Sequence, residues 1–267
     1  MMATRRFWCV AIAVLCLASW AAAGTTATLT LTSDGNIAYD GVYVGPYYAT
    51  VNGVPNTPIV CDDFADPAAV NKTWKTDVTS FSNLASDLGN TLWGSYYLSK
   101  KVASATIVDW YEQAAWLAQG LLTQSPKSNN QAYYSYAVWA VFDPSGVLQW
   151  LENHNQNGHG ADNAACNAIF GSNCWSVKLT HLTSGLLWMA EQNYMKGNYA
   201  NLLIFTPLGS NGKPCSVGDC PGQEFFRPMA VAEGGIAGMY VLLAVAFCLA
   251  GMFLRSRRQG LGRGSAV

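Results

Sequence analysis

The sequence predicts an α+β fold: a β-rich N-terminal part with helices packed against it, plus one C-terminal transmembrane helix. Three observations support this: alternating threonines near the N-terminus, helical periodicity in the middle, and a long uncharged run before the C-terminus. At 267 residues, the chain has room for one domain, or at most two, after its ends are removed. We expect one α+β ectodomain over residues 25–207.

Period-two alternation predicts the strands of the N-terminal third. Thr25–Thr32 alternates threonine with alanine and leucine, which is typical of a half-buried strand. The Asn-Gly pair at 52–53 lies between Tyr47–Val51 and Thr57–Cys61, and this dipeptide is a strong hairpin signal. Thr73–Phe81 has the same strand-like composition. A final strand is expected over Leu202–Thr206.

Helical periodicity follows the strands. From about Ser104 to Leu122 the apolar residues recur on one helical face, namely Ile107, Trp110, Tyr111, Ala114, Leu117 and Leu121. A second helix is expected at Gln131–Phe142, where Asp143 ends it because a residue before proline disfavours the α conformation. A third is expected at Ser184–Lys196. Repeated Asn, Gly and His predict a loop over 152–163.

The N-terminus predicts export. Residues 1–23 combine Arg5 and Arg6, an apolar run and an Ala-rich cleavage site, which is the pattern of a secretory signal peptide. Residues 25–233 contain all sixteen acidic residues and nine of the fifteen basic ones, a formal charge of −7. This acidic composition argues against nucleic acid as a partner.

Five cysteines lie between the signal peptide and the C-terminal run. In an oxidising compartment, close spacing predicts the disulfides Cys166–Cys174 and Cys215–Cys220, although spacing alone does not determine connectivity. The second pair lies in 208–230, a segment rich in Gly, Pro and Ser, which we interpret as a disulfide-stapled linker. Cys61 is left over and is flagged as an odd cysteine.

The segment 231–258 has three parts: a short motif, an uncharged run over Ile236–Leu254 and a basic stop. The run is about 30 Å long as a helix, matching a bilayer core and predicting a transmembrane helix. The arginines mark the cytoplasmic side and put the preceding residues outside. The motif residues are Val231, Glu233, Gly234 and Gly235, and the stop residues are Arg255, Arg257 and Arg258.

This layout resembles the C-terminal sorting signal of PEP-CTERM proteins, in its Val-Pro-Glu-Gly-Gly variant, with Ala232 at the proline position. The resemblance implies a membrane-inserted signal and an exosortase-type processing enzyme as a partner. It further implies a protein anchored with its ectodomain outside, or released to the cell surface or extracellular matrix. Exopolysaccharide or other surface proteins are the expected binding partners.

A second set of residues is similar to the thioester domains of bacterial surface proteins: Val60 to Phe64, Trp74, and the Ala-Val-Trp triplet at 137–139. That resemblance implies an internal thioester between Cys61 and a helix glutamine. Ser135 occupies the glutamine position, and Gln131 lies one turn earlier. A covalent adhesin using Cys61 and Gln131 is therefore an alternative to a non-enzymatic surface protein.

Three other site chemistries are alternatives. An envelope cysteine hydrolase pairs Cys61 with His154, His159 or His181, because imidazole lowers a thiol pKa. A zinc site made of His154, His159, Cys166 and Cys174 is a further alternative, although the spacing of these residues fits no common zinc site. Asp62, Asp63 and Asp66 could bind calcium through their carboxylate oxygens, and the alternative interpretation of these acids is a solvated turn. We expect no enzyme activity, no cofactor and no bound metal, and we expect most of the aromatic residues to form a core.

Overall fold

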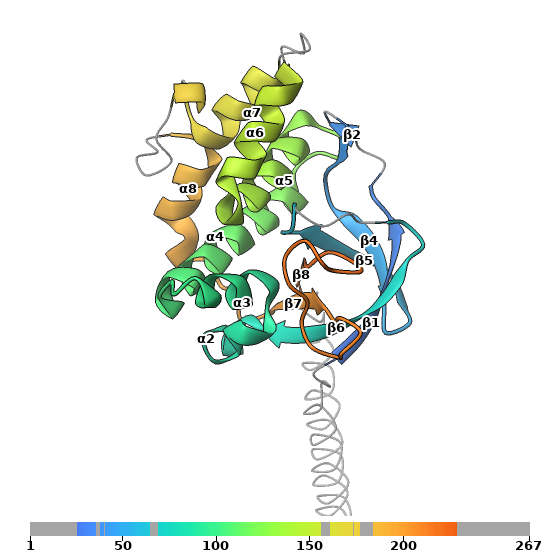
Figure 1. Ribbon diagram of the computed structural model, residues 1–267. Helices are drawn as coiled ribbons and strands as arrows, with labels where there is room; N and C mark the ends of the chain where they lie inside the picture. The colour runs from blue at the N-terminus through green and yellow to red at the C-terminus, as the bar shows by residue number, and fades with distance from the viewer. Residues whose placement is uncertain are drawn as a thin grey trace, which may run out of the picture. The chain divides into compact units, whose positions relative to one another are not determined.

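Six antiparallel strands close a barrel, and helices cover one side of it (Figure 1). The computed structural model describes residues 26–35, 38–39, 41–64, 69–155, 161–172, 174–176 and 184–228, all within one compact unit. The strands follow one another around the barrel as β1, β4, β5, β8, β7 and β6. Their bounds are Thr26–Ser33 (β1), Tyr47–Val51 (β4), Val54–Cys61 (β5), Thr73–Ser80 (β6), Leu202–Pro207 (β7) and Phe225–Pro228 (β8).

The predicted N-terminal strands are confirmed. Along β1, Ala27, Leu29 and Leu31 are buried, whereas the threonines between them face outward or are half-buried. The β4–β5 hairpin turns at Asn52 and Gly53, whose φ angles of 49° and 83° are both positive, as a two-residue type I′ turn requires. A separate short pair, β2 (Ala38–Tyr39) and β3 (Val42–Tyr43), lies between β1 and β4 in the sequence.

Buried aromatic side chains from three strands pack against one another in the barrel. The ring of Phe225 on β8 lies 6.2 Å from the Trp74 ring and 5.8 Å from the Tyr47 ring, centre to centre. Because these rings come from β8, β6 and β4, the barrel interior is assembled from strands at both ends of the domain.

The helices form a layer in which α5 is central. It packs against α4, α6, α7 and α8 and against strand β5, so residues around its whole circumference are buried. The Ser128 side chain caps its first turn by accepting from the Gln131 amide. The helices are α2 (Leu84–Asp87), α3 (Leu92–Ser99), α4 (Ser104–Thr123), α5 (Asn129–Phe142), α6 (Pro144–Asn155), α7 (Ala161–Phe170) and α8 (Gly185–Asn193).

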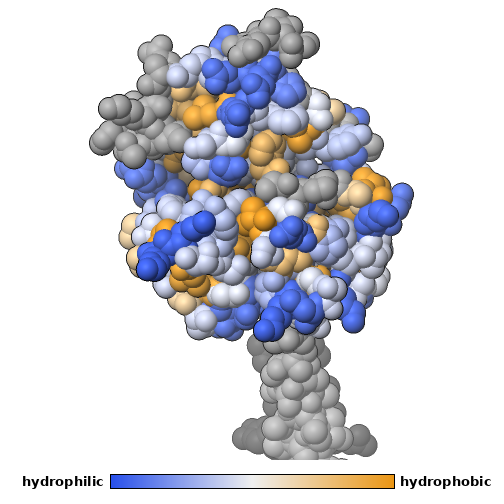
Figure 2. Space-filling view, in the orientation of Figure 1, coloured by the Kyte–Doolittle hydropathy of each residue, from blue (hydrophilic) through white to orange (hydrophobic). Residues whose placement is uncertain are grey.

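The predicted end of α5 is confirmed, and the chain then re-enters a helix. Asp143 ends α5, and its Oδ1 accepts from the Gly146 amide at 2.9 Å in the first turn of α6. The expectation of a loop throughout 152–163 is wrong, because α6 runs to Asn155 and α7 begins at Ala161. The polar residues Glu152 and Asn153 lie on the exposed side of α6, where they are compatible with a helix. Figure 2 shows hydrophilic residues gathered at this end of the helical layer.

The fold class predicted from the sequence is corrected in two respects. The β structure is not confined to the N-terminal part, because β7 and β8 complete a closed barrel and β8 falls in the segment interpreted as a linker. In addition, none of the helices in the described ranges has the length and apolarity needed to cross a membrane. The run Ile236–Leu254, on which the predicted transmembrane helix fell, lies outside the described residues.

Candidate functional site

Three acidic side chains are buried where β5 ends and β8 begins. Cys61 pairs with Phe225 as the last residues of the β5–β8 ladder, so Asp62 and Glu224 are the next neighbours in register. The Asp62 amide donates to the Glu224 carbonyl at 3.4 Å. Asp62, Asp63 and Glu224 each have 0% of their surface exposed. Carboxyl groups are rarely buried to this degree without partners.

Glu224 receives its partners from three elements. The Leu92 amide at the start of α3 donates to Oε2 at 2.7 Å, and the Tyr111 hydroxyl of α4 donates to Oε1 at 2.7 Å. The Thr206 hydroxyl of β7 also donates to Oε2. Hydrogen bonds to a buried charged group are stronger than neutral ones, so this carboxylate ties the barrel to α3 and α4.

Asp62 lies beside Glu224 and competes with it for ionisation. Burial raises the pKa of Asp62 well above its ordinary value, and the neighbouring Glu224 raises it further. Burial also raises the pKa of Glu224, although its three donors offset part of that effect. Two adjacent carboxyl groups in an apolar site cannot both ionise cheaply. The donors therefore favour a charged Glu224 with the proton retained on Asp62.

Cys61 belongs to the same cluster. Its Sγ donates to the Asp63 carbonyl at 3.0 Å, and that oxygen also accepts from Gln223 Nε2 at 2.9 Å. Burial raises the pKa of the Cys61 thiol well above its ordinary value, and the carboxyl groups of Asp63 and Asp62 raise it further. The thiol is therefore protonated near neutral pH, which is the unreactive form.

The two residues of the predicted thioester make separate hydrogen bonds. Gln131 Oε1 accepts from the Lys127 amide at 2.7 Å. The α5 residue beside the Cys61 sulfur is Trp139, which is eight residues after Gln131 and so about 12 Å further along a helix. Ser135, at the glutamine position, accepts from the Gly45 amide at 2.8 Å. A bond between Cys61 and Gln131 stays a prediction.

The histidine and metal alternatives fall partly on residues outside the described ranges, namely His159, His181 and Asp66. The ring of His154 stacks on Trp150 at 4.3 Å, and its Nδ1 contacts the Trp150 carbonyl at 2.9 Å. Within the described ranges, His, Cys, Asp and Glu form no group of three that is arranged to hold a metal ion.

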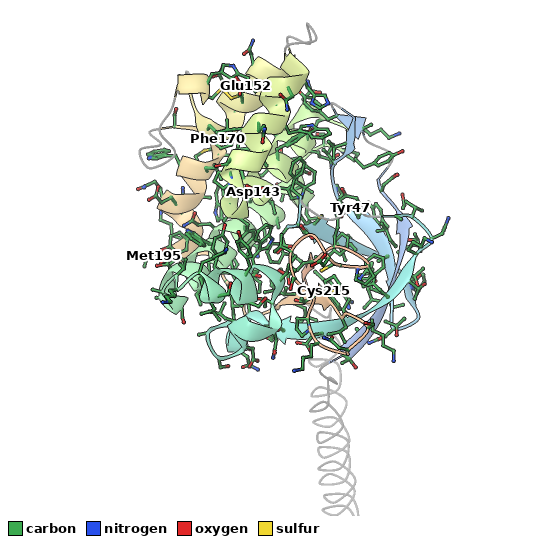
Figure 3. All side chains as sticks on the ribbon, viewed as in Figure 1. Tyr47, Asp143, Glu152, Phe170, Met195 and Cys215 are labelled. Carbon is green, nitrogen blue, oxygen red and sulfur yellow. A yellow bond between two sulfur atoms is a disulfide. The ribbon has the colours of Figure 1, made fainter. Side chains whose placement is uncertain are left out.

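Cys166 and Cys174 are joined by a disulfide, as predicted, which links α7 to the short helix η3 (Cys174–Ser176). Their sulfurs are consequently not available as zinc ligands. Cys215 is buried, and Figure 3 places it beside the barrel. Cys220 Sγ contacts the Ser216 carbonyl at 3.4 Å. The pair Cys215–Cys220 stays a prediction.

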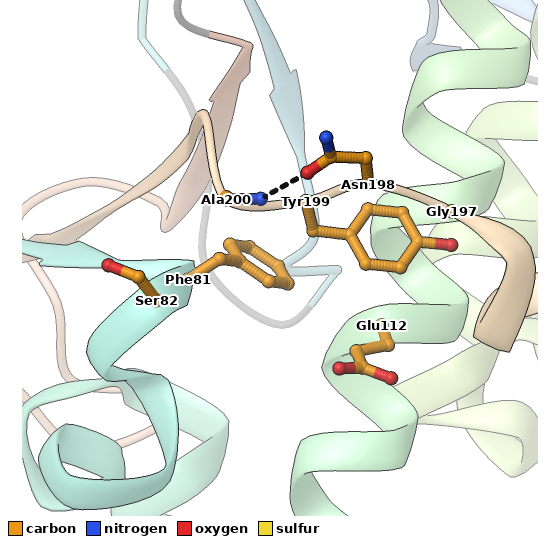
Figure 4. A pocket seen from close by; sticks show the side chains of 7 residues that line it. All are labelled: Phe81, Ser82, Glu112, Gly197, Asn198, Tyr199 and Ala200. Carbon is orange, nitrogen blue, oxygen red and sulfur yellow. Dashed lines mark hydrogen bonds between the residues drawn. The ribbon is translucent and has the colours of Figure 1, made fainter.

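A pocket of about 260 Å³ opens between α4, residues 81–82 and the segment 197–200 that precedes β7 (Figure 4). Its lining residues are Phe81, Ser82, Glu112, Gly197, Asn198, Tyr199 and Ala200. Sequence reasoning missed this pocket because its three segments are far apart in the chain and none carries a motif. It also missed Glu224, whose only signal is an acidic residue directly before the two phenylalanines of β8.

The predicted signal peptide, the motif at Val231, Glu233, Gly234 and Gly235, and the arginines 255, 257 and 258 all lie outside the described residues. No family model matches the chain, and no curated protein or solved structure is significantly similar to it.

Proposed function

We propose that this chain is an exported, non-enzymatic protein that is held at the cell surface or in the extracellular matrix through its C-terminal segment 231–258. The Cys166–Cys174 disulfide carries the proposal, because disulfides form and persist mainly in oxidising compartments outside the cytosol. The signal-peptide pattern of residues 1–23 and the acidic composition of 25–233 support the same location. The expected partners are an exosortase-type enzyme and exopolysaccharide or surface proteins.

The burial of the acidic cluster supports a structural role for it. A general acid, general base or nucleophile must reach the substrate atom on which it acts. Asp62, Asp63, Glu224 and Cys61 are each at most 1% exposed, and Glu224 takes its donors from within the protein. We therefore interpret the cluster as a joint between barrel and helices.

Neither alternative function gains an observation in its favour. A thioester requires a glutamine carboxamide beside Cys61, but the carboxamide oxygen of Gln131 accepts from the Lys127 amide instead. A cysteine hydrolase requires an ionisable thiol. Burial and the adjacent carboxyl groups instead raise the pKa of Cys61.

Deletion of residues 231–267 tests the sorting step in a host that carries an exosortase. We expect the full chain in the envelope or matrix fraction and the shortened chain in the medium. Deletion of 259–267 is the matched control, because it leaves the motif, the apolar run and the arginines in place. If the fractions are the same for all three chains, the proposal is wrong.

A further inference from the structure

The pocket beside β7 is a solvent-open site whose chemistry differs from that of the buried cluster. Phe81 enters it from the short helix η1 (Phe81–Asn83), Glu112 from α4, and residues 197–200 from the segment before β7. In Figure 4 the Phe81 ring, the Tyr199 ring and the Glu112 carboxylate border the same space. The two rings are 5.9 Å apart, centre to centre, at 47°. The pocket is thus aromatic on one side and anionic on the other.

The aromatic wall is held in place by local contacts. Tyr199 is only 7% exposed, and its hydroxyl donates to the Tyr194 carbonyl at 2.7 Å. Gly197 permits this packing, since a Cβ there would lie 2.1 Å from the Tyr199 hydroxyl oxygen. The Ala200 amide donates to Asn198 Oδ1 at 3.2 Å, which fixes the segment between them (Figure 4). A preformed wall lowers the entropic cost of binding a ligand.

The anionic side has an excess of negative charge. Glu112 is half-buried, and no other described residue makes a hydrogen bond or ion pair with its carboxylate. Asp109 lies one helical turn earlier and, after burial, is the cause that raises the pKa of Glu112. Burial raises the pKa of the nearby Tyr194, and the negative charges of Asp109, Glu112 and Glu191 raise it further. The ammonium of Lys196 on the adjoining segment is 3.0 Å from Asn193 Oδ1 instead.

We propose that this pocket binds an organic cation, an alkylammonium or guanidinium group, with its charge beside Glu112 and its carbon chain against Phe81 and Tyr199. Aromatic faces attract cations, and the neighbouring carboxylates add a Coulombic attraction that an uncharged ligand does not receive. A neutral sugar ring also stacks on aromatic residues, but it leaves Glu112, the acid that lines the pocket, without a counter-charge. The proposal stands independently of export.

The source of the cation is distinguished by the choice of probe. The purified full chain is titrated with n-butylammonium, with Nα-acetyl-lysine amide and with Nα-acetyl-arginine amide, and methyl glucoside serves as the neutral comparator. We expect the cations to bind with millimolar affinity that weakens as salt is added, because the site is open to solvent. Tighter binding of the amino-acid amides than of butylammonium assigns the site to a polypeptide side chain; the reverse assigns it to a free amine.

Variants locate the binding. Glu112→Gln is expected to weaken cation binding about tenfold, which corresponds to about 1.4 kcal/mol, and Phe81→Ala is expected to weaken it as well. Glu152→Gln is the matched control, because Glu152 is an exposed glutamate on α6 that does not line the pocket. Met195 lies shortly before the pocket segment in the chain, and Figure 3 shows Glu152 far from it. Thermal unfolding verifies that each variant folds. The proposal is overturned if no cation binds, if Glu112→Gln binds as well as the parent, or if methyl glucoside binds at least as tightly.

Discussion

The Tyr111 hydroxyl donates a 2.7 Å hydrogen bond to Glu224, joining residues that are 113 positions apart. Tyr111 comes from the middle of α4, and Glu224 comes directly before β8, the strand that completes the barrel between β5 and β7. Both side chains are fully buried. This contact therefore links the closure of the barrel to the docking of the helices, and it makes the stability of the whole unit sensitive to one hydroxyl group.

Replacing Tyr111 by Phe is expected to lower the free energy of unfolding by about 1.5–3 kcal/mol, the usual contribution of a hydrogen bond to a charged group. The change leaves Glu224 with one donor fewer and removes the acceptor of the Gly94 amide. Urea denaturation followed by circular dichroism measures the loss. Tyr48→Phe is the control, because Tyr48 is 38% exposed on the barrel surface. Equal losses in the two variants would contradict the assigned role of Tyr111.

Asp62→Asn is expected to raise stability at neutral pH and to flatten its dependence on pH. Burial and Glu224 raise the pKa of Asp62 above its ordinary value of 3.8, so the folded protein binds more protons than the unfolded chain once the pH exceeds about 4. The free energy of unfolding therefore falls as the pH rises from that point. An asparagine has no proton to lose, and it places a neutral amide group beside Glu224.

Urea midpoints of Asp62→Asn and of the parent protein, measured between pH 4 and 8, give the two slopes. Asp77→Asn is the matched control, because the pKa of Asp77 is also raised by burial but its side chain is only half-buried. The assignment of a retained proton to Asp62 is refuted if the parent protein becomes more stable as the pH rises through this window and Asp62→Asn shows the same slope.

Loss of the Cys166–Cys174 disulfide is expected to lower the free energy of unfolding by about 2–3 kcal/mol, from the closure entropy of a loop of eight residues. The double variant Cys166→Ser, Cys174→Ser should unfold at a lower temperature than the parent in the absence of reductant. Addition of a reductant should lower the melting temperature of the parent more than that of the variant. An equal response of both proteins would mean that the bond does not form in the purified protein.

Gly197→Ala is expected to destabilise the pocket wall by about 1–3 kcal/mol, the usual cost of overpacking, because the new methyl group meets the Tyr199 ring. Gly89→Ala is the matched control, since a Cβ there has no neighbour within 4 Å. Differential scanning calorimetry compares the two variants. If both melt at the temperature of the parent, the close approach of Gly197 to Tyr199 is not present in solution.

The Cys61 thiol is expected to react slowly with iodoacetamide in the folded protein and rapidly after denaturation. It is 1% exposed, and burial raises its pKa, so little thiolate is present at neutral pH. Peptide mapping after timed alkylation measures this residue separately from Cys215 and Cys220. Treatment with methylamine should leave the intact mass unchanged. A single methylamine adduct with a newly exposed thiol would instead support the covalent-adhesin alternative.

The local features of the fold could be predicted because short stretches of sequence determine them. The Asn-Gly turn, the alternation of β1 and the apolar face of α4 each depend on neighbouring residues, and all three are confirmed. The pairing of Cys166 with Cys174 followed from a spacing of eight residues. The segment 208–230 was misjudged as a linker because its Gly, Pro and Ser content is typical of one. Strand β8 within it has only four residues, too few for a period-two alternation to be recognised.

By itself, the sequence determined the strands and helices that have strong local patterns and the expectation of export, and it predicted the disulfide between Cys166 and Cys174. Only the tertiary structure decided that β7 and β8 close the barrel, that Asp62 meets Glu224, and that Phe81, Glu112 and Tyr199 share a pocket. The physical reason is distance along the chain. Periodicity and turn chemistry act over a few residues, whereas a buried carboxylate or a pocket depends on contacts between segments that only folding brings together.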